Sequence, residues 1–158
     1  MMLAMRRYLR LLLPMLVVFA SLAFVSRVAA QSDRMRLVLV TSSHSPVEAL
    51  ASSEVRRLYL GVPVAVAGQA ILPLRYTERQ AQEVFLQKVL FMSLQAYERQ
   101  IVAHTFRSGR SRPEEGANVA SVTQSLLANP FAVSYLPEDE ARKAAGIKII
   151  GALWDTGS

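Results

Sequence analysis

The sequence predicts an α/β fold: a single three-layer-like domain in which a small mixed β-sheet is flanked by helices. Three observations lead to this prediction. Short apolar runs rich in β-branched residues, typical of buried strands, occur near both ends of the chain. Between them lie longer amphipathic segments that follow helix-capping residues. The two kinds of segment follow one another without an internal repeat or a low-complexity linker, which favours one layered domain.

Residues 1–30 have the layout of a secretory signal peptide. Three arginines precede an apolar run at 11–25, and small residues at 28–30 form a cleavage pattern before Gln31. An uncleaved anchor is the alternative, although the run is shorter than the ~20 residues that span a membrane. We therefore expect an exported domain over residues 31–158, with the signal segment as its only membrane contact.

The net charge gives little support for nucleic-acid binding. The chain has 18 Lys and Arg against 12 Asp and Glu, a net charge of +6. Four of these arginines lie within residues 1–30, which contain no acid, so residues 31–158 carry 14 − 12 = +2. Because nucleic-acid binding depends on a strongly basic surface, we expect no nucleic-acid partner.

A strand and a capped helix are predicted to come first in the mature part. The apolar run RLVLV at 36–40 is typical of a buried strand. Ser45 at the N-cap, Pro46 at the first helical position and Glu48 at the third form a capping box. We therefore expect a helix from Pro46 to about Tyr59.

A hairpin and three further helices are predicted to follow. Residues 62–76 contain two extended apolar runs around Gly68 and Gln69, which is the pattern of a hairpin. Three segments with helical spacing of apolar residues then begin at capping residues. These helices are expected from Thr77 to about Phe91, from Ser93 to about Thr105, and from Asn118 to Asn129.

The C-terminal part is predicted to contain two strands joined by a polar connection. FAVSYL at 131–136 and the run at 147–150 have the apolar character of short strands. The polar segment 137–146 between them is expected to be helical. The tail ALWDTGS at 152–158 is expected to fray.

Two predicted strand ends carry residues that suit an oxoanion. Thr41, Ser42 and Ser43 precede the first predicted helix, and N–H groups at a helix N-terminus attract anions. Arg75 and Thr77 precede the next one, and arginine grips an oxoanion through two parallel hydrogen bonds. The alternatives are a hydroxyl-rich turn that caps its own helix and an exposed arginine at a strand end. The residues alone leave both alternatives open.

The loop HTFRSGRSRPEEG at 104–116 gathers three arginines, Arg107, Arg110 and Arg112. Arginines of this kind converge on phosphate groups in many proteins. Glu114 and Glu115 follow directly, however, and surface ion pairs contribute only ~0–1 kcal/mol. We therefore favour a solvated loop in which the arginines pair with these two acids.

The sequence gives little support for an enzyme, a cofactor or a metal. It lacks the G-x-S-x-G, H-E-x-x-H and Walker motifs. The chain has no cysteine, and its two histidines, His44 and His104, are far apart. We therefore expect neither a disulfide nor a zinc site, and we expect a non-enzymatic protein without a cofactor.

Four blocks of sequence, taken in order, resemble one known family. They are VLVTSSHSPVEALASSEVRRLYLG (38–61), ILPLRYTERQAQEVFLQKVLFMS (71–93), FRSGRSRP (106–113) and VTQSLLANPFAVSYL (122–136). Together they resemble short, single-domain relatives of phosphate ABC-transporter substrate-binding proteins, in the type 2 periplasmic binding protein superfamily. The resemblance implies a periplasmic location, a PBP-like α/β fold, and an ABC permease or another envelope protein as a partner.

The resemblance also implies a ligand side for phosphate or a similar oxoanion. Full-length phosphate binders use an R-x-x-G-S-G-T-like turn before the helix expected here near Thr77. This chain retains Arg75 and Thr77 but lacks the glycines and the serine that let backbone N–H groups approach an anion. The alternative is an envelope interaction or accessory protein that keeps the fold and binds no small molecule. The residues expected on the ligand side are Thr41, Ser42, Ser43, Arg75 and Thr77.

Overall fold

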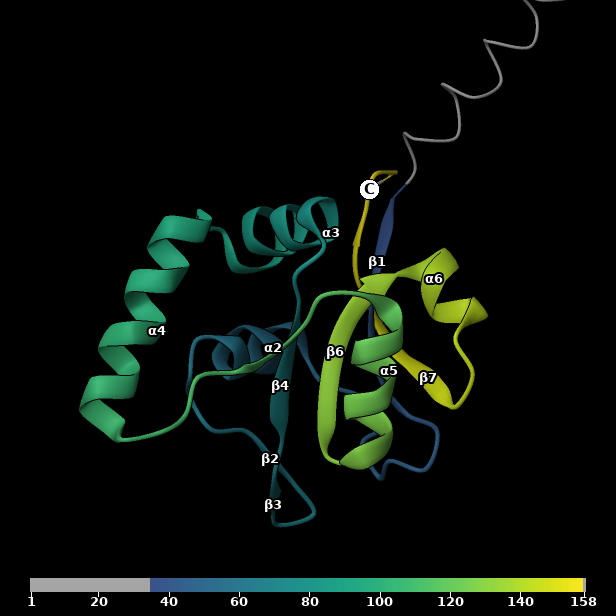
Figure 1. The fold of residues 1–158 in the computed structure, drawn as a ribbon, viewed down its shortest axis with the longest axis horizontal. Helices are drawn as coiled ribbons and strands as arrows, with labels where there is room; N and C mark the ends of the chain where they lie inside the picture. Colours follow the sequence, from purple (N-terminus) through teal and green to yellow (C-terminus); the bar gives the residue numbers. More distant parts are fainter. Residues whose placement is uncertain (1–34, 158) are drawn as a thin grey trace, which may run out of the picture. The chain divides into compact units, whose positions relative to one another are not determined.

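The computed structural model describes residues 35–157, so the predicted signal peptide lies outside the described residues. They contain a five-stranded mixed sheet with helices on both faces (Figure 1), as the sequence predicted. The strand order is β5-β4-β6-β1-β7. Strand β1 runs antiparallel to β6 and β7, whereas β4 runs parallel to β5 and β6. The strands are β1 (Arg36–Ser42), β4 (Leu72–Tyr76), β5 (Glu114–Gly116), β6 (Ala132–Pro137) and β7 (Ile147–Asp155).

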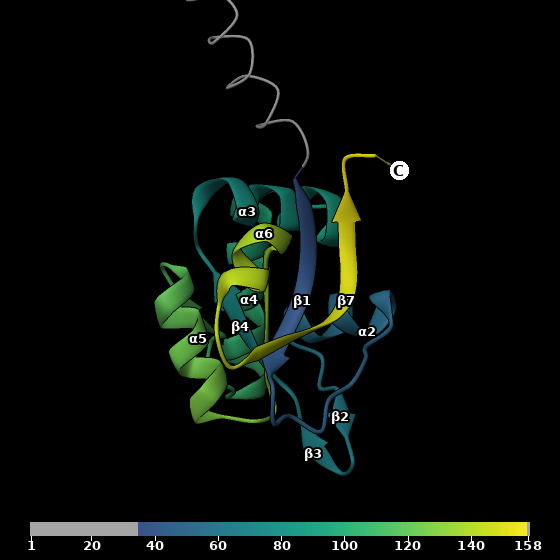
Figure 2. The same ribbon diagram turned by 90° about the vertical axis from the view of Figure 1, so that its right-hand side faces the viewer.

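The helices cover the two faces of the sheet and one of its sides. Helix α2 (Ser52–Tyr59) and the π-helix η1 (Phe85–Leu90) pack on one face, and α5 (Val119–Ala128) and α6 (Glu138–Lys143) pack on the other (Figure 2). Helix α3 (Arg79–Val84) continues directly into η1, and α4 (Leu94–Ser108) stands beside the sheet (Figure 1). Within residues 35–157, none of these helices has the length and apolar character needed to cross a membrane.

Three aromatic rings join α2 and η1 to the sheet. The ring of Phe85 stacks on that of Tyr135, with centroids 3.8 Å apart, and Tyr59 meets Phe85 edge-on at 4.7 Å. The Tyr59 hydroxyl donates to the carbonyl of Leu74 at 3.0 Å, and the Tyr135 hydroxyl donates to that of Tyr76 at 2.8 Å. Because both carbonyls belong to β4, this cluster fixes the position of the strand that carries Arg75.

A hairpin forms within residues 62–76 as expected, but it is confined to residues 65–70, and residues 72–76 join the main sheet as β4. Strands β2 (Ala65–Val66) and β3 (Gln69–Ala70) pair antiparallel. Ala67 and Gly68, which join them, have positive φ values of 51° and 78°. A tight two-residue turn with left-handed backbone matches the twist of the paired strands. The chain then continues from β3 into β4.

The first helix begins later than its capping box predicted. Residues 45–51 are not helical, and α2 begins at Ser52. The Ser45 carbonyl, which would accept the first helical hydrogen bond, accepts instead from Nζ of Lys148 at 2.8 Å. The carboxylate of Glu54 accepts from the backbone N–H of Ala51 at 2.8 Å, which marks the true start. A contact with distant β7 therefore overrides the local signal.

The C-terminal tail pairs with β1 as far as Asp155, so the expected fraying is wrong for residues 152–155. In β7, Trp154 lies opposite Leu37 and Asp155 lies opposite Arg36. Two register shifts interrupt this pairing, and each bulge disturbs the alternation of inward and outward side chains. The sequence pattern of this strand is therefore too irregular to reveal its full length.

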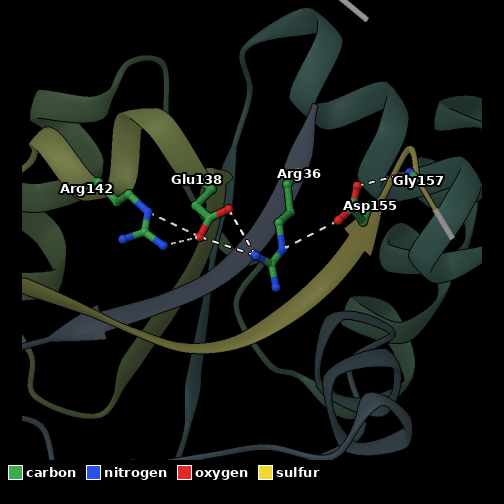
Figure 3. Close-up of polar contacts among 5 residues, drawn as sticks. All are labelled: Arg36, Glu138, Arg142, Asp155 and Gly157. Carbon is green, nitrogen blue, oxygen red and sulfur yellow. Dashed lines mark hydrogen bonds and ion pairs between the residues drawn. The ribbon is translucent and has the colours of Figure 1, made fainter. Parts of the chain in front are cut away.

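Ion pairs join the ends of β1, β7 and α6 (Figure 3). Nη1 of Arg36 lies 3.2 Å from Oε2 of Glu138, and its Nε lies 3.9 Å from Oδ2 of Asp155. Nη2 of Arg142, one turn along α6, donates to Oε1 of Glu138 at 2.6 Å. Because these partners come from three elements, the cluster fixes α6 against β1 and β7.

Candidate functional site

Arg75 is a buried cation near the C-terminal end of β4. The residue is 5% exposed, and its Cζ lies 4.7 Å from the centre of the Tyr97 ring of α4. Its Nη1 donates to Oε1 of Glu98 at 2.9 Å and to Oε1 of Glu115 at 2.8 Å. Burial raises the pKa of Tyr97 to about 12, so this ring stays neutral at physiological pH. The guanidinium is therefore paired on one side and stacked on its face.

Both ion pairs of Arg75 use the same nitrogen. Within residues 35–157, its Nε and Nη2 groups have no hydrogen-bond partner. Neither nitrogen is fully enclosed. The enclosed polar atoms without a partner in this range are the Tyr97 hydroxyl, Nε2 of His104 and Oγ1 of Thr123. The Nε–Nη2 edge therefore keeps its hydrogen-bonding capacity. It is an edge with which arginine holds a carboxylate or phosphate through two parallel hydrogen bonds.

The charges around Arg75 are balanced. Nη1 of Arg112 lies 3.7 Å from Oε2 of Glu98, so two cations face two carboxylates. The Glu115 side chain is 54% exposed and the Arg112 side chain is similarly exposed, whereas that of Arg75 is only 6% exposed. The carboxylates thus lie on the solvent side of a buried cation.

Thr77 follows Arg75 but does not cap the next helix as predicted. Its backbone N–H and its Oγ1 both donate to the Gly116 carbonyl, at 3.0 and 3.3 Å, so Thr77 extends the pairing of β4 with β5. The N-cap is Glu78, whose carboxylate accepts from the N–H groups of Gln80 and Ala81 at 3.2 and 2.9 Å. A side-chain anion therefore occupies the helix start that was expected to face the ligand.

Thr41 and Ser42 are the last two residues of β1, and Ser43 begins the turn that follows. The buried Thr41 Oγ1 donates to the Ala132 carbonyl at 2.7 Å. Ser42 is also buried, and its Oγ accepts from the N–H of His44 at 3.4 Å. Ser43 is exposed, with its Oγ 3.3 Å from Nδ1 of His44. No helix starts beside them, so they do not cap a helix: the Thr41 hydroxyl bonds to β6, and those of Ser42 and Ser43 lie against His44.

The five residues expected on one ligand side lie at opposite ends of the sheet, so the expectation of a common side is corrected. Thr41 pairs with Val133, and Pro73 of β4 pairs with the same residue from the other side of β6. Because β1 and β4 run in opposite directions, Thr77 lies roughly 13 Å farther along the sheet, at ~3.3 Å per residue. The structure keeps Arg75 and Thr77 together and separates them from residues 41–43.

The arginine loop differs from its predicted form in its acidic part. Helix α4 extends to Ser108 and ends at Gly109, whose φ is 67°. Glu114–Gly116 then forms the edge strand β5, which the sequence did not reveal. The expected pairing with the loop arginines is wrong, because Glu115 pairs with Arg75 and Glu114 accepts from Oγ of Ser125 at 2.7 Å.

Sequence reasoning missed Tyr97, Glu98 and Glu115 as residues of the site. The sequence singled out neither Tyr97 nor Glu98, and it assigned Glu115 to the loop arginines as an ion-pair partner. Their contacts with Arg75 join residues 23 and 40 positions apart. Glu115 reaches Arg75 because the two residues are register partners in the parallel β4–β5 pair.

The comparisons with known proteins concern the fold alone. No protein-family model matches the chain, and no curated protein matches its sequence. An ABC-type phosphate transport receptor from Vibrio cholerae matches with a TM-score of 0.53 and 11% identity, over 75% of this chain and 46% of that one. A second match is a protein from Clostridium perfringens, described as a phosphate ABC transporter substrate-binding protein and solved with bound phosphate. Its TM-score is 0.55 at 12% identity, over 75% of this chain and 45% of that one.

A possible phosphate binding protein from Planctomyces limnophilus gives a TM-score of 0.52 and 14% identity, over 75% of this chain and 41% of that one. The chain thus spans less than half the length of each of these proteins. The predicted resemblance is confirmed for the fold: residues of this chain adopt the mixed α/β fold of part of a phosphate-type substrate-binding protein.

Proposed function

We propose that this protein is an exported, solute-binding-type protein that binds phosphate or a similar oxoanion at Arg75. The observation that carries the proposal is the unpaired Nε–Nη2 edge of a buried arginine. Such an edge matches two oxygens of a tetrahedral or planar oxoanion. The proteins similar in fold support the same ligand class, since all three are described by their relation to phosphate.

The residues around Arg75 have separate roles in this proposal. Tyr97 keeps the guanidinium plane fixed, so little conformational entropy is lost when an anion binds. Burial lowers the local dielectric constant and strengthens the interaction with the anion. Glu78 occupies the N–H groups at the start of α3, so the anion gains no hydrogen bonds from that helix. We therefore expect weaker binding than a site with a free helix N-terminus would provide.

Export and a transport partner belong to the same proposal. We propose that cleavage after Ala30 releases the domain into the periplasm, where an ABC permease receives the bound anion or a sensor detects it. N-terminal sequencing of the exported protein checks the first step, with Gln31 as the expected first residue. Retention of residues 1–30 on the exported protein would indicate a membrane anchor instead.

A thermal-shift titration tests the ligand. Saturation with phosphate at 100 times its Kd stabilises a protein by ~2.7 kcal/mol. Arg75→Lys keeps the positive charge but loses the two-pronged geometry, so we expect the shift to disappear. Ser43→Ala, at the other end of the sheet, should keep it. If no oxoanion shifts the melting temperature at constant ionic strength, the oxoanion proposal fails.

An envelope interaction or accessory protein is the second candidate. Two observations favour it: Glu78 fills the anion position at α3, and the two predicted halves of the site are at opposite ends of the sheet. This candidate predicts no thermal shift with any oxoanion. It also predicts that the exported protein co-purifies with another envelope protein after cross-linking in cells.

A further inference from the structure

We infer that Glu98 and Glu115 regulate the Arg75 site as internal competitors of its ligand, and that anion binding loosens helix α4. The inference rests on the proposed oxoanion function and adds a regulation to it. It starts from the two carboxylates that already share Nη1 of Arg75, at 2.9 and 2.8 Å. An anion that binds to the Nε–Nη2 edge lies close to these two carboxylates, because all three anions contact one guanidinium. Both carboxylates therefore repel it.

The two carboxylates are placed so that they can leave. The Glu115 and Glu98 side chains are partly exposed, and they lie on the solvent side of Arg75. Water solvates a released carboxylate at little cost, whereas Arg75 itself stays buried and must keep a partner. An incoming oxoanion supplies that partner. Binding is therefore an exchange of one internal anion, or both, for an external one.

Glu98 connects this exchange to α4. It is the α4 residue that holds both Arg75 and Arg112. The rest of the helix is weakly attached: only Tyr97 and Ile101 are fully buried, and Phe106 is 86% exposed.

Two polar atoms on α4 also weaken its attachment. The Tyr97 hydroxyl and Nε2 of His104 are enclosed without a hydrogen-bond partner within the part that the structure describes. Enclosing an unpaired polar atom costs desolvation free energy that no bond returns. Release of Glu98 from Arg75 therefore removes an ion pair from a helix with little else to hold it. By linkage, whatever loosens α4 in turn favours the anion.

Isothermal titration with inorganic phosphate at constant ionic strength tests the competition. We compare the wild type, the double variant Glu98→Gln and Glu115→Gln, and a control double variant, Glu48→Gln and Glu83→Gln. The control changes the net charge equally at two exposed acids that do not contact Arg75. We expect the Glu98→Gln and Glu115→Gln double variant to bind phosphate at least about tenfold more tightly than the wild type and the control. The reason is that two negative charges near the anion are removed.

The outcomes separate this inference from the proposed function. Equal phosphate affinity in all three proteins overturns the inference and leaves the function in place. Binding by the Glu98 and Glu115 variant alone supports the inference and shows that the wild-type site is closed to phosphate, so the proposed function fails. Absence of binding in all three folded proteins, with folding checked by circular dichroism, overturns both. Should the double variant not fold, Glu115→Gln alone keeps the Glu98 anchor and should still bind more tightly.

Hydrogen exchange tests the effect on α4. Saturating phosphate should speed amide exchange across residues 94–108 of the wild-type protein and leave α5 unchanged. An α4 that exchanges at the same rate or more slowly with phosphate would overturn the coupling. In the Arg75→Lys protein, phosphate should have no effect on either helix.

Discussion

A buried guanidinium needs partners, and Arg75 has them on only part of its surface. Removing a charge from water costs several kcal/mol unless ion pairs and hydrogen bonds compensate. Glu98 and Glu115 compensate through Nη1, and the Tyr97 ring covers one face. The Nε–Nη2 edge has no protein partner within residues 35–157, and it is the reason for placing the ligand here.

The Tyr97 hydroxyl should contribute nothing to stability. It is buried without a partner, so Tyr97→Phe should leave the free energy of unfolding unchanged or raise it. The matched control is Tyr59→Phe, which removes the hydroxyl that contacts the carbonyls of Leu74 and Val133 and should cost about 1–2 kcal/mol. Urea denaturation measures both. A larger loss for Tyr97→Phe than for Tyr59→Phe would contradict this account of α4.

Glu138 should make stability depend on pH in the acidic range. Its hydrogen bond with Arg142 holds the pKa of Glu138 below its usual value. A carboxyl with a depressed folded pKa stabilises the fold above its unfolded value, ~4.3, and that contribution is lost as the pH falls through the folded value. Glu138→Gln should therefore flatten the acidic side of the stability profile measured by urea denaturation.

Asp139→Asn is the control for this prediction. Asp139 is the next residue on α6, and its pair with Lys143 is longer, at 3.7 Å, and far more exposed. Exposed pairs of this kind contribute little to stability. An equal change of the acidic profile in both variants would show that the Glu138 pairs have no special role.

At the scale of elements, α4 is the part whose position depends most on individual side chains. Helix α4 stands beside the sheet (Figure 1). The faces of the sheet are covered by other helices, namely α2, η1, α5 and α6. The His104 ring, near its C-terminal end, packs against Gly61 after α2. Ion pairs from Glu98 and the buried side chains of Tyr97 and Ile101 complete the attachment. Changes at these few contacts should affect α4 before they affect the sheet.

Gly61→Ala should loosen α4 and lower stability. A Cβ at this position would lie 2.5 Å from Cδ2 of His104, and the φ of +90° is strained for alanine. Gly68→Ala is the matched control, because its φ is +78° and nothing lies within 4 Å of the added Cβ. Thermal denaturation should show a clearly larger loss for Gly61→Ala. Equal losses would mean that backbone strain alone is responsible and that His104 does not pack there.

Elements with a strong local signal could be predicted from the sequence, and those fixed by distant contacts could not. The helices capped by Ser93 and Asn118 and the strand at β6 agree with their apolar spacing. The start of α2 depends on Lys148, which is 103 positions from Ser45. Strand β5 has only three residues and exists because it pairs with β4. No pattern within either segment indicates these contacts.

The candidate site shows the same division. Arg75 could be recognised from its position at a strand end, and the structure places it in a buried cluster. Its partners Glu98 and Glu115 come from α4 and β5, so only the tertiary fold brings them together. Thr41 and Thr77 were grouped by their residue types and by the family resemblance, whereas β1 and β4 run in opposite directions on either side of β6.

At the scale of the whole molecule, the chain corresponds to a fraction of the larger proteins that share its fold. It spans 41% to 46% of their lengths, with TM-scores from 0.52 to 0.55. Any ligand site within residues 35–157 must therefore be built from this sheet and its helices. Arg75 satisfies that condition, because it lies on β4 and its side-chain partners come from β5 and α4.

A crystal structure of the protein soaked in phosphate tests the central claim most directly. We expect phosphate oxygens at ~2.7–2.9 Å from both Nε and Nη2 of Arg75, the usual length of such charged hydrogen bonds. At least one of Glu98 and Glu115 should have moved away from Nη1. Phosphate bound only at residues 41–43, or an Arg75 edge without phosphate at saturating concentration, would contradict the account.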